Sequence, residues 1–173
     1  MPSLEHDDPE RVNPWERDER LDEIYQRPGF MLRRAHQIAV GIFADECGEF
    51  DLTTTQHGVL TALLRFPALD QISLGRLLGL DRSTIGTVVK RLEERGLIQR
   101  GMSGDDRRRR VLHLTPEGER LQIAVGDAAA RAQERLLSAF TPLEATMLLG
   151  LLTKLIEVNN AETRVPMRAD IRS

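Results

Sequence analysis

The sequence is poor in several residue types and patterns, and each absence excludes a class of protein. One cysteine among 173 residues excludes a disulfide framework and a cysteine-based zinc site, and it favours a reducing, cytoplasmic setting. No apolar run approaches the roughly 18 residues of a membrane span. The N-terminus, MPSLEHDDPERV, lacks the apolar region of a signal peptide. We therefore expect a cytoplasmic protein without a membrane partner.

Patterns typical of catalysis and cofactor binding are missing as well. The chain has no Gly-rich phosphate loop, no G-x-S-x-G elbow and no paired carboxylates at a catalytic spacing. Its four histidines do not cluster with acidic residues at metal-ligand spacing. We therefore expect no enzymatic activity, no cofactor and no bound metal.

Charged residues of both signs are present, but they are unevenly distributed over a chain of net charge −3. Residues 1–27 carry nine acids and four bases, whereas residues 82–110 carry nine bases and four acids. A local basic block within an acidic chain predicts one anion-binding face. Arginine supplies 22 of the 24 bases, which suits phosphate and guanine contacts but is equally explained by GC-rich codon usage.

Apolar periodicity predicts a mainly α-helical chain with one small β-hairpin. Helical spacing of apolar residues begins at Gly29, and capping-box patterns at Thr53 and Thr141 open later helices. The predicted segments are an acidic arm that includes a short helix (1–28), a first long helix (29–52), a compact middle domain (53–115), C-terminal helices (116–160) and a tail (161–173).

Two short helices joined by a tight turn occupy the middle domain. We expect Ser73 to cap the first helix and Asp81, after the turn that begins at Gly79, to cap the second. The second helix buries a stripe of Ile85, Val88, Val89 and Leu92. Its outer face carries small, polar and basic residues: Arg82, Ser83, Thr84, Thr87, Lys90 and Arg91. This pattern is typical of a helix-turn-helix, whose second helix enters the major groove of DNA.

A hairpin with a basic tip follows this helix pair. Strands expected over 97–100 and 111–114 flank a Gly-containing tip with four consecutive arginines. Such a wing can insert arginine into a narrow minor groove while the helix occupies the adjacent major groove. The alternative is a helical pair with a solvated polar face, or a winged helix that mediates only protein contacts.

The run from Leu74 to Thr115 resembles the MarR family of bacterial winged-helix regulators, and the likeness extends over about residues 29–160. The family's D-x-R wing pattern falls on Asp106 and Arg108. The resemblance implies that Arg108 is the minor-groove arginine, that Asp106 orients it and that Arg107 lies beside it. It also assigns base and backbone contacts to the six outer residues of the second helix.

The flanking helices favour a homodimer. Apolar stripes over 29–52 and 116–160 exceed what one small winged helix can cover, so burial against a two-fold mate is expected. The family likewise uses such helices for dimerisation, with a pseudo-palindromic DNA duplex as the partner. A monomer with a separate helical subdomain is the alternative.

A small-molecule effector is the last expectation. His36 and His57 lie on the first two long helices, where the family's effector pocket forms, and Arg33 and Gln37 accompany them. Imidazole would meet a hydroxyl or ring nitrogen and guanidinium a carboxylate, so an aromatic acid fits. The resemblance thus implies a ligand-responsive repressor of aromatic-acid catabolism genes, released by an aromatic carboxylate or its thioester. Histidines without a ligand, a DNA-binding protein without an effector, and a regulator of stress or efflux genes remain alternatives.

Cys47 raises the peroxide-sensing branch of the same family. That branch places its reactive cysteine near the start of the first helix, whereas Cys47 lies at the end of that helix beside Glu46 and Glu49. Both acids would raise the pKa of the thiol, so we expect a structural or incidental cysteine.

Overall fold

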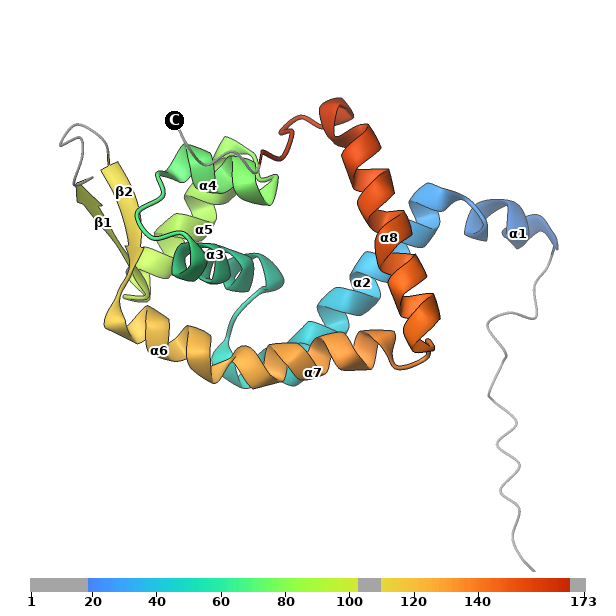
Figure 1. The fold of residues 1–173 in the computed structure, drawn as a ribbon, viewed down its shortest axis with the longest axis horizontal. Helices are drawn as coiled ribbons and strands as arrows, with labels where there is room; N and C mark the ends of the chain where they lie inside the picture. Colours follow the sequence, from blue (N-terminus) through green and yellow to red (C-terminus); the bar gives the residue numbers. More distant parts are fainter. Residues whose placement is uncertain (1–18, 103–109, 169–173) are drawn as a thin grey trace, which may run out of the picture. The chain divides into compact units, whose positions relative to one another are not determined.

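The computed structural model describes residues 19–102 and 110–168 (Figure 1). They fall into two compact units, a first that ends at Ile38 and a second that begins at Ala39. The expected mainly helical class with one antiparallel hairpin is confirmed. The wing residues Asp106, Arg107 and Arg108 lie outside the described residues.

The first unit contains α1 (Glu19–Tyr25) and the N-terminal part of α2 (Pro28–Cys47). Proline is tolerated at the start of α2 because the first N–H groups of a helix have no intrahelical acceptor. The rings of Tyr25 and Phe30 lie 5.0 Å apart between centroids. The first long helix expected over 29–52 corresponds to α2, which starts at Pro28 and ends at Cys47, earlier than expected.

The second unit contains the rest of α2 and the winged helix-turn-helix. Its remaining elements are the 3₁₀ turn η1 (Gly48–Phe50), α3 (Thr54–Arg65), α4 (Gln71–Leu78), α5 (Arg82–Glu94), β1 (Ile98–Met102), β2 (Arg110–Leu114), α6 (Pro116–Ala124), α7 (Gly126–Leu137), α8 (Pro142–Asn159) and η2 (Asn160–Glu162). Both predicted capping boxes are present, at the starts of α3 and α8.

The hydrophobic core of this unit lies between α3, α4, α5 and the hairpin. Its largest fully buried side chains are Leu60, Leu63, Leu74, Leu92 and Leu112. In the sheet, Ile98 pairs with Leu114 and Met102 with Arg110. The backbone N–H of Leu112 also donates to the carbonyl of Leu69, at 2.8 Å, which joins β2 to the loop between α3 and α4. The hairpin is therefore attached to the helical core through β2.

Three sequence-based expectations about local structure were wrong. Asp70, not Ser73, caps α4: its carboxylate accepts from the backbone N–H of Ser73 at 2.9 Å, so the helix begins three residues earlier, at Gln71. Val88 is only half-buried, while Val89 is fully buried. The expected single helix after Thr115 is interrupted at Val125, immediately before Gly126, a residue of low helix propensity.

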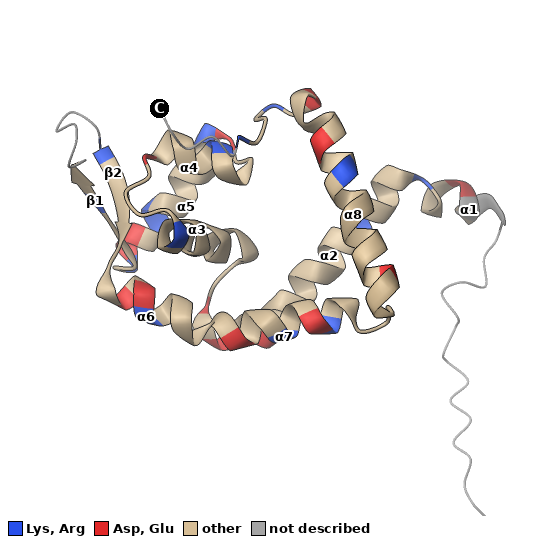
Figure 2. Ribbon diagram, in the orientation of Figure 1, with Lys and Arg blue, Asp and Glu red and all other residues tan. Residues whose placement is uncertain are grey.

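The C-terminal helix α8 exposes much of its apolar surface. Figure 2 shows few charged residues along α8, whereas α6 and α7 carry acids and bases along their length. No residue of α8 is buried. Among the described residues, no single helix is long and apolar enough to cross a membrane. Only one pair of segments, 116–137 and 142–162, reaches that length and apolar composition when taken together, and the two are bent by 99° relative to each other.

Candidate DNA-binding face and effector region

Helix α5 has one buried face and one open face. Ile85, Val89 and Leu92 are at most 3% exposed and pack into the core. Of the predicted contact residues, Thr84 is half-buried and the other five are exposed: Arg82, Ser83, Thr87, Lys90 and Arg91. The open face of α5 therefore presents hydroxyl and cationic side chains to solvent.

Asp81 organises the first turn of α5. Its carboxylate accepts from the backbone N–H groups of Ser83 and Thr84, both at 2.9 Å, and from their hydroxyls at 2.6 and 2.7 Å. The Ser83 hydroxyl is the largest of the causes that lower the pKa of Asp81 well below its usual value, so this acid stays ionised. Thr87 donates its hydroxyl proton to the Ser83 carbonyl at 3.0 Å. The three hydroxyl groups thus keep only their oxygen lone pairs for an outside donor.

Two arginines of the basic block, Arg95 and Arg100, bind other residues of the protein. Arg100 on β1 forms a 2.9 Å ion pair with Glu93 of α5 and donates to the side chain of Gln71 on α4 at 3.2 Å. Arg95 donates to the backbone carbonyls of Phe50 and Asp51 below the helix. The sequence analysis counted both arginines as part of an anion-binding face, because partners so distant in sequence leave no local pattern. Both arginines instead connect α5 and β1 to other parts of the second unit.

Three of the four predicted effector residues lie in the first unit. Arg33, His36 and Gln37 are exposed on α2. Arg33 and Gln37 line a largely apolar groove of about 670 Å³ that includes the Tyr25 and Phe30 rings; His36 does not line it. The Arg33 guanidinium lies over the Phe30 ring at 5.0 Å, a cation–π contact.

The fourth, His57, lies in the second unit and is half-buried. Burial lowers the pKa of His57, so the ring is more readily neutral than a free histidine. Its Nε2 is 3.3 Å from the Nε2 of Gln122 on α6, and Gln122 also donates to the hydroxyl of Thr61 at 2.8 Å. The Oε1 of Gln122 is buried and has no hydrogen-bond partner among the described residues. The structure thus adds Thr61 and Gln122 to the immediate surroundings of His57.

Sequence reasoning missed Gln122. The only sign was a polar residue between Leu121 and Val125, within a helix face that is otherwise apolar.

Among the described residues, no group of three or more His, Cys, Asp or Glu side chains is arranged to hold a metal ion.

Comparison with known proteins identifies the family. A MarR-family profile matches residues 50–109, which span α3 to the wing. A protein named as a candidate transcriptional regulator of the hcr operon in Thauera aromatica is 35% identical over 146 residues, which cover 81% of this chain and 84% of that protein. The chain belongs to the MarR family. The transcriptional repressor NicR of Pseudomonas putida is 30% identical over 135 residues, or 78% of this chain and 85% of NicR.

Solved structures of other MarR-type regulators have the same fold. PcaV of Streptomyces coelicolor with its natural ligand has a TM-score of 0.69 and 33% identity, and covers 78% of this chain and 94% of its own. BpsR of Bordetella bronchiseptica, whose DNA binding is regulated by 6-hydroxynicotinic acid, has a TM-score of 0.71 and 29% identity, and the match covers 76% of this chain and 94% of BpsR. The repressor CouR bound to a 23-mer DNA duplex has a TM-score of 0.73 and 28% identity, and the match covers 78% of this chain and 96% of CouR. This MarR-family chain is a DNA-binding transcriptional regulator, and its relatives are regulators rather than enzymes.

Cys47 of this MarR-type regulator is fully buried at the end of α2. Burial is the largest cause that raises the pKa of its thiol, followed by the charge of Glu46, which outweighs the lowering by Arg131. The direction matches the expectation from the neighbouring acids, but the main cause does not. A buried, protonated thiol is a poor nucleophile, which favours a structural role.

Proposed function

We propose that this MarR-type regulator is a homodimeric repressor that an aromatic acid releases from its operator. The observation that carries the DNA-binding part is the open face of α5, opposite three buried apolar residues and joined to a hairpin. DNA contacts are assigned to Arg82, Ser83, Thr84, Thr87, Lys90 and Arg91 on the helix and to Asp106, Arg107 and Arg108 on the wing.

These residues divide between the two kinds of contact that DNA offers. Exposed arginine and lysine side chains suit phosphates and guanine edges, and the hydroxyl lone pairs suit the amino groups of adenine or cytosine. Arg108 would enter the minor groove, where narrow segments concentrate negative potential. Two copies of α5 about 34 Å apart would match a pseudo-palindromic site.

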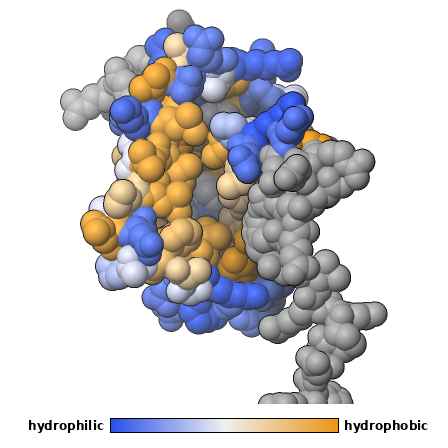
Figure 3. Space-filling model, turned by 90° about the vertical axis from the view of Figure 1, so that its right-hand side faces the viewer, coloured by the Kyte–Doolittle hydropathy of each residue, from blue (hydrophilic) through white to orange (hydrophobic). Residues whose placement is uncertain are grey.

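The apolar surface of α8 supports the homodimer. Its exposed large apolar residues are Leu143, Met147, Leu149, Leu151, Leu155, Ile156 and Val158. Figure 3 shows a continuous apolar band on one face of the molecule. A surface of this kind is rarely left open to water, and a second copy of the same chain supplies a cover of matching character.

An aromatic carboxylate, or its thioester, is the proposed effector. The regulation of BpsR by 6-hydroxynicotinic acid supports this class, because that regulator covers most of this chain. Contacts are assigned to Arg33, His36, Gln37 and His57, with guanidinium meeting the carboxylate and imidazole a hydroxyl or ring nitrogen. An effector that binds the DNA-incompetent state about 100-fold better than the competent state supplies about 2.7 kcal/mol, enough to release an operator.

The DNA-binding part is tested with two variants and a control, on an operator duplex selected from a random library and measured by fluorescence anisotropy. Arg108→Ala should cost about 1–3 kcal/mol of operator affinity, and replacing Thr87 and Arg91 together by alanine should abolish operator preference. The control is Arg120→Ala on α6, an exposed arginine paired with Glu117. All three should melt within a few degrees of wild type. Unchanged binding by the folded Thr87/Arg91 variant would show that α5 presents another face to DNA.

The effector part is tested by titrating the protein–operator complex with hydroxylated and heteroaromatic carboxylates. At least one should weaken binding, and His36→Ala or His57→Ala should blunt that response without changing operator affinity. A silent panel, or both variants responding as wild type does, contradicts this assignment.

A further inference from the structure

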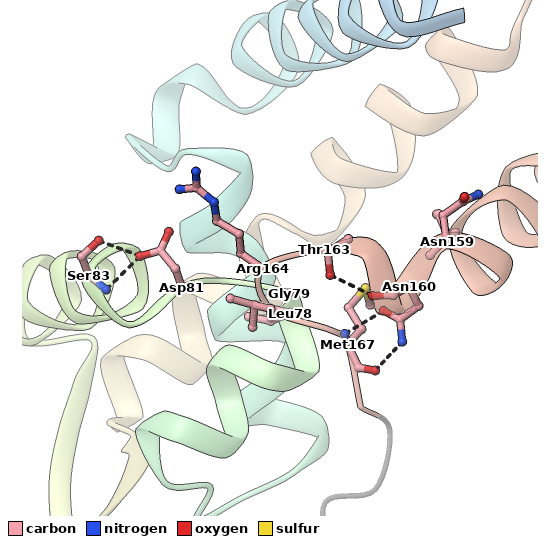
Figure 4. Close-up of a pocket in the computed structure, with 11 residues that line it drawn as sticks. Leu78, Gly79, Asp81, Ser83, Asn159, Asn160, Thr163, Arg164 and Met167 are labelled. Carbon is pink, nitrogen blue, oxygen red and sulfur yellow. Dashed lines mark hydrogen bonds between the residues drawn. The ribbon is translucent and has the colours of Figure 1, made fainter.

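The chain after α8 folds back on itself into a closed loop, here called the C-terminal segment (residues 160–168). The side chain of Asn160 forms two hydrogen bonds with the backbone of Met167: it donates to the carbonyl at 2.9 Å and accepts from the N–H at 2.8 Å (Figure 4). Thr163 adds a third bond, from its hydroxyl to the Asn160 carbonyl at 2.9 Å. One asparagine therefore determines the course of the segment.

This loop is attached to the helix-turn-helix. The backbone N–H of Arg168 donates to the carbonyl of Arg76, near the end of α4, at 3.2 Å. The Met167 side chain covers Gly79, the left-handed residue (φ +65°) between α4 and α5, and its Cγ would lie 3.1 Å from a Cβ at that position. Val165 is half-buried and lines a groove with Ile72 and Ile85 of the two helices. The segment thus contacts the helix-turn-helix through Met167 and Arg168, and Val165 lies beside the same two helices.

The docked loop brings a cationic side chain to the start of α5. Arg164 lines a cavity of about 630 Å³ together with Asp81 and Ser83, the cap and an early residue of that helix (Figure 4). Arg164 is exposed, and no ion pair or hydrogen bond of its side chain to another described residue is found. The Asp81 carboxylate is already held by the first turn of α5. The guanidinium is therefore available to an outside anion.

We propose that Arg164 binds a DNA backbone phosphate beside the groove that α5 enters, so that the C-terminal segment belongs to the DNA-binding surface. The inference rests on the proposed function, because it requires that α5 face the duplex. The N-terminal residues of a recognition helix contact base edges, so the flanking phosphates pass close to that end. Arginine is suited to them because its guanidinium can form two parallel hydrogen bonds with phosphate oxygens.

Asn160 is then a positioning residue. An arginine on a loose tail must lose conformational freedom when it binds, whereas a docked loop has already done so. Asn160→Ala removes both bonds to Met167 and should therefore weaken DNA binding through Arg164, without removing any charge.

The test measures binding of the full-length protein to a labelled random-sequence duplex over a series of KCl concentrations. Because a phosphate contact releases counterions, Arg164→Gln should lower the salt slope by about 0.9 for each bound chain and weaken binding about eightfold per contact at 0.1 M salt. Arg164→Lys should keep the slope. The matched control, Arg120→Gln, removes the same charge from α6 and should leave the slope unchanged. Arg164→Gln should have a smaller effect in an Asn160→Ala background than in wild type.

Two results would overturn the inference. One is a wild-type salt slope for Arg164→Gln; the other is an equal effect of Arg164→Gln and Arg120→Gln. Arg91→Ala on the open face of α5 separates this failure from that of the proposed function. If Arg91→Ala weakens binding and Arg164→Gln does not, only the role of Arg164 is wrong; if neither does, the orientation of α5 is wrong as well.

Discussion

Gly118, in the first turn of α6, provides the sharpest test of how the wing is attached to the helices. A Cβ at this position would overlap the carbonyl oxygen of Leu97 and lie 3.0 Å from its carbonyl carbon. The same carbonyl accepts a 3.0 Å hydrogen bond from the backbone N–H of Thr115, the cap of α6. Gly118→Ala must therefore push α6 away from the start of the hairpin, because backbone cannot rotate aside as a side chain can.

The expected sign follows from three magnitudes. Alanine favours a helix interior over glycine by about 1 kcal/mol. Forcing an extra methyl group into packed structure costs about 1–3 kcal/mol, and loss of the Thr115–Leu97 bond adds about 1 kcal/mol. Gly118→Ala should therefore lower the free energy of unfolding by about 1–3 kcal/mol. For a chain of this length, each kcal/mol corresponds to about 2–4 °C in Tm.

The measurement is thermal and urea unfolding followed by far-ultraviolet circular dichroism, at one fixed protein concentration because association shifts apparent stability. Gly126→Ala, at the start of α7, is the matched control: it is exposed, and nothing lies within 4 Å of its added Cβ. That change should raise stability by about 0.5–1 kcal/mol. Equal shifts of the same sign in the two variants would refute the close approach of α6 to Leu97.

Other predictions follow from single side chains. Asp81→Ala should fray the start of α5 and weaken operator binding, measured by anisotropy. Asp81→Asn should preserve the helix start and the binding, since asparagine offers an oxygen to the same N–H groups. Equal loss of binding in both variants would show that the charge matters more than the cap. Because the pKa of His57 lies below its usual value of 6.5, the unfolded chain binds a proton more readily than the folded protein. The contribution of His57 to stability is therefore complete above about pH 6.5 and lost as the pH falls below it. His57→Gln should flatten this part of a urea-unfolding pH profile, and an unchanged profile would contradict it. Val89→Asp should unfold the second unit, seen by circular dichroism, because a carboxylate at this fully buried position would lie in the hydrophobic core. A folded variant would place Val89 outside the core.

The order and kind of the elements could be predicted because their determinants are close in sequence. The capping boxes at Thr53 and Thr141, the Thr115-Pro116 helix start and the left-handed Gly79 each involve residues within four positions of one another. The Ser73 error shows where this fails: a cap and a first-turn residue are both short and polar, and only backbone geometry distinguishes Asp70 from Ser73.

The winged helix-turn-helix, the open face of α5 and the family could be read from the sequence, because periodicity, caps and motif spacing are properties of neighbouring residues. Which arginine side chains remain available to DNA depends instead on how the chain packs. Arg95 and Arg100 bind backbone and side chains far along the chain, and Arg164 reaches the start of α5 through a loop folded back after α8. The same holds for Gln122, which meets His57 across 65 positions. Such pairings depend on how helices pack, and packing joins residues whose separation in sequence carries no periodic pattern.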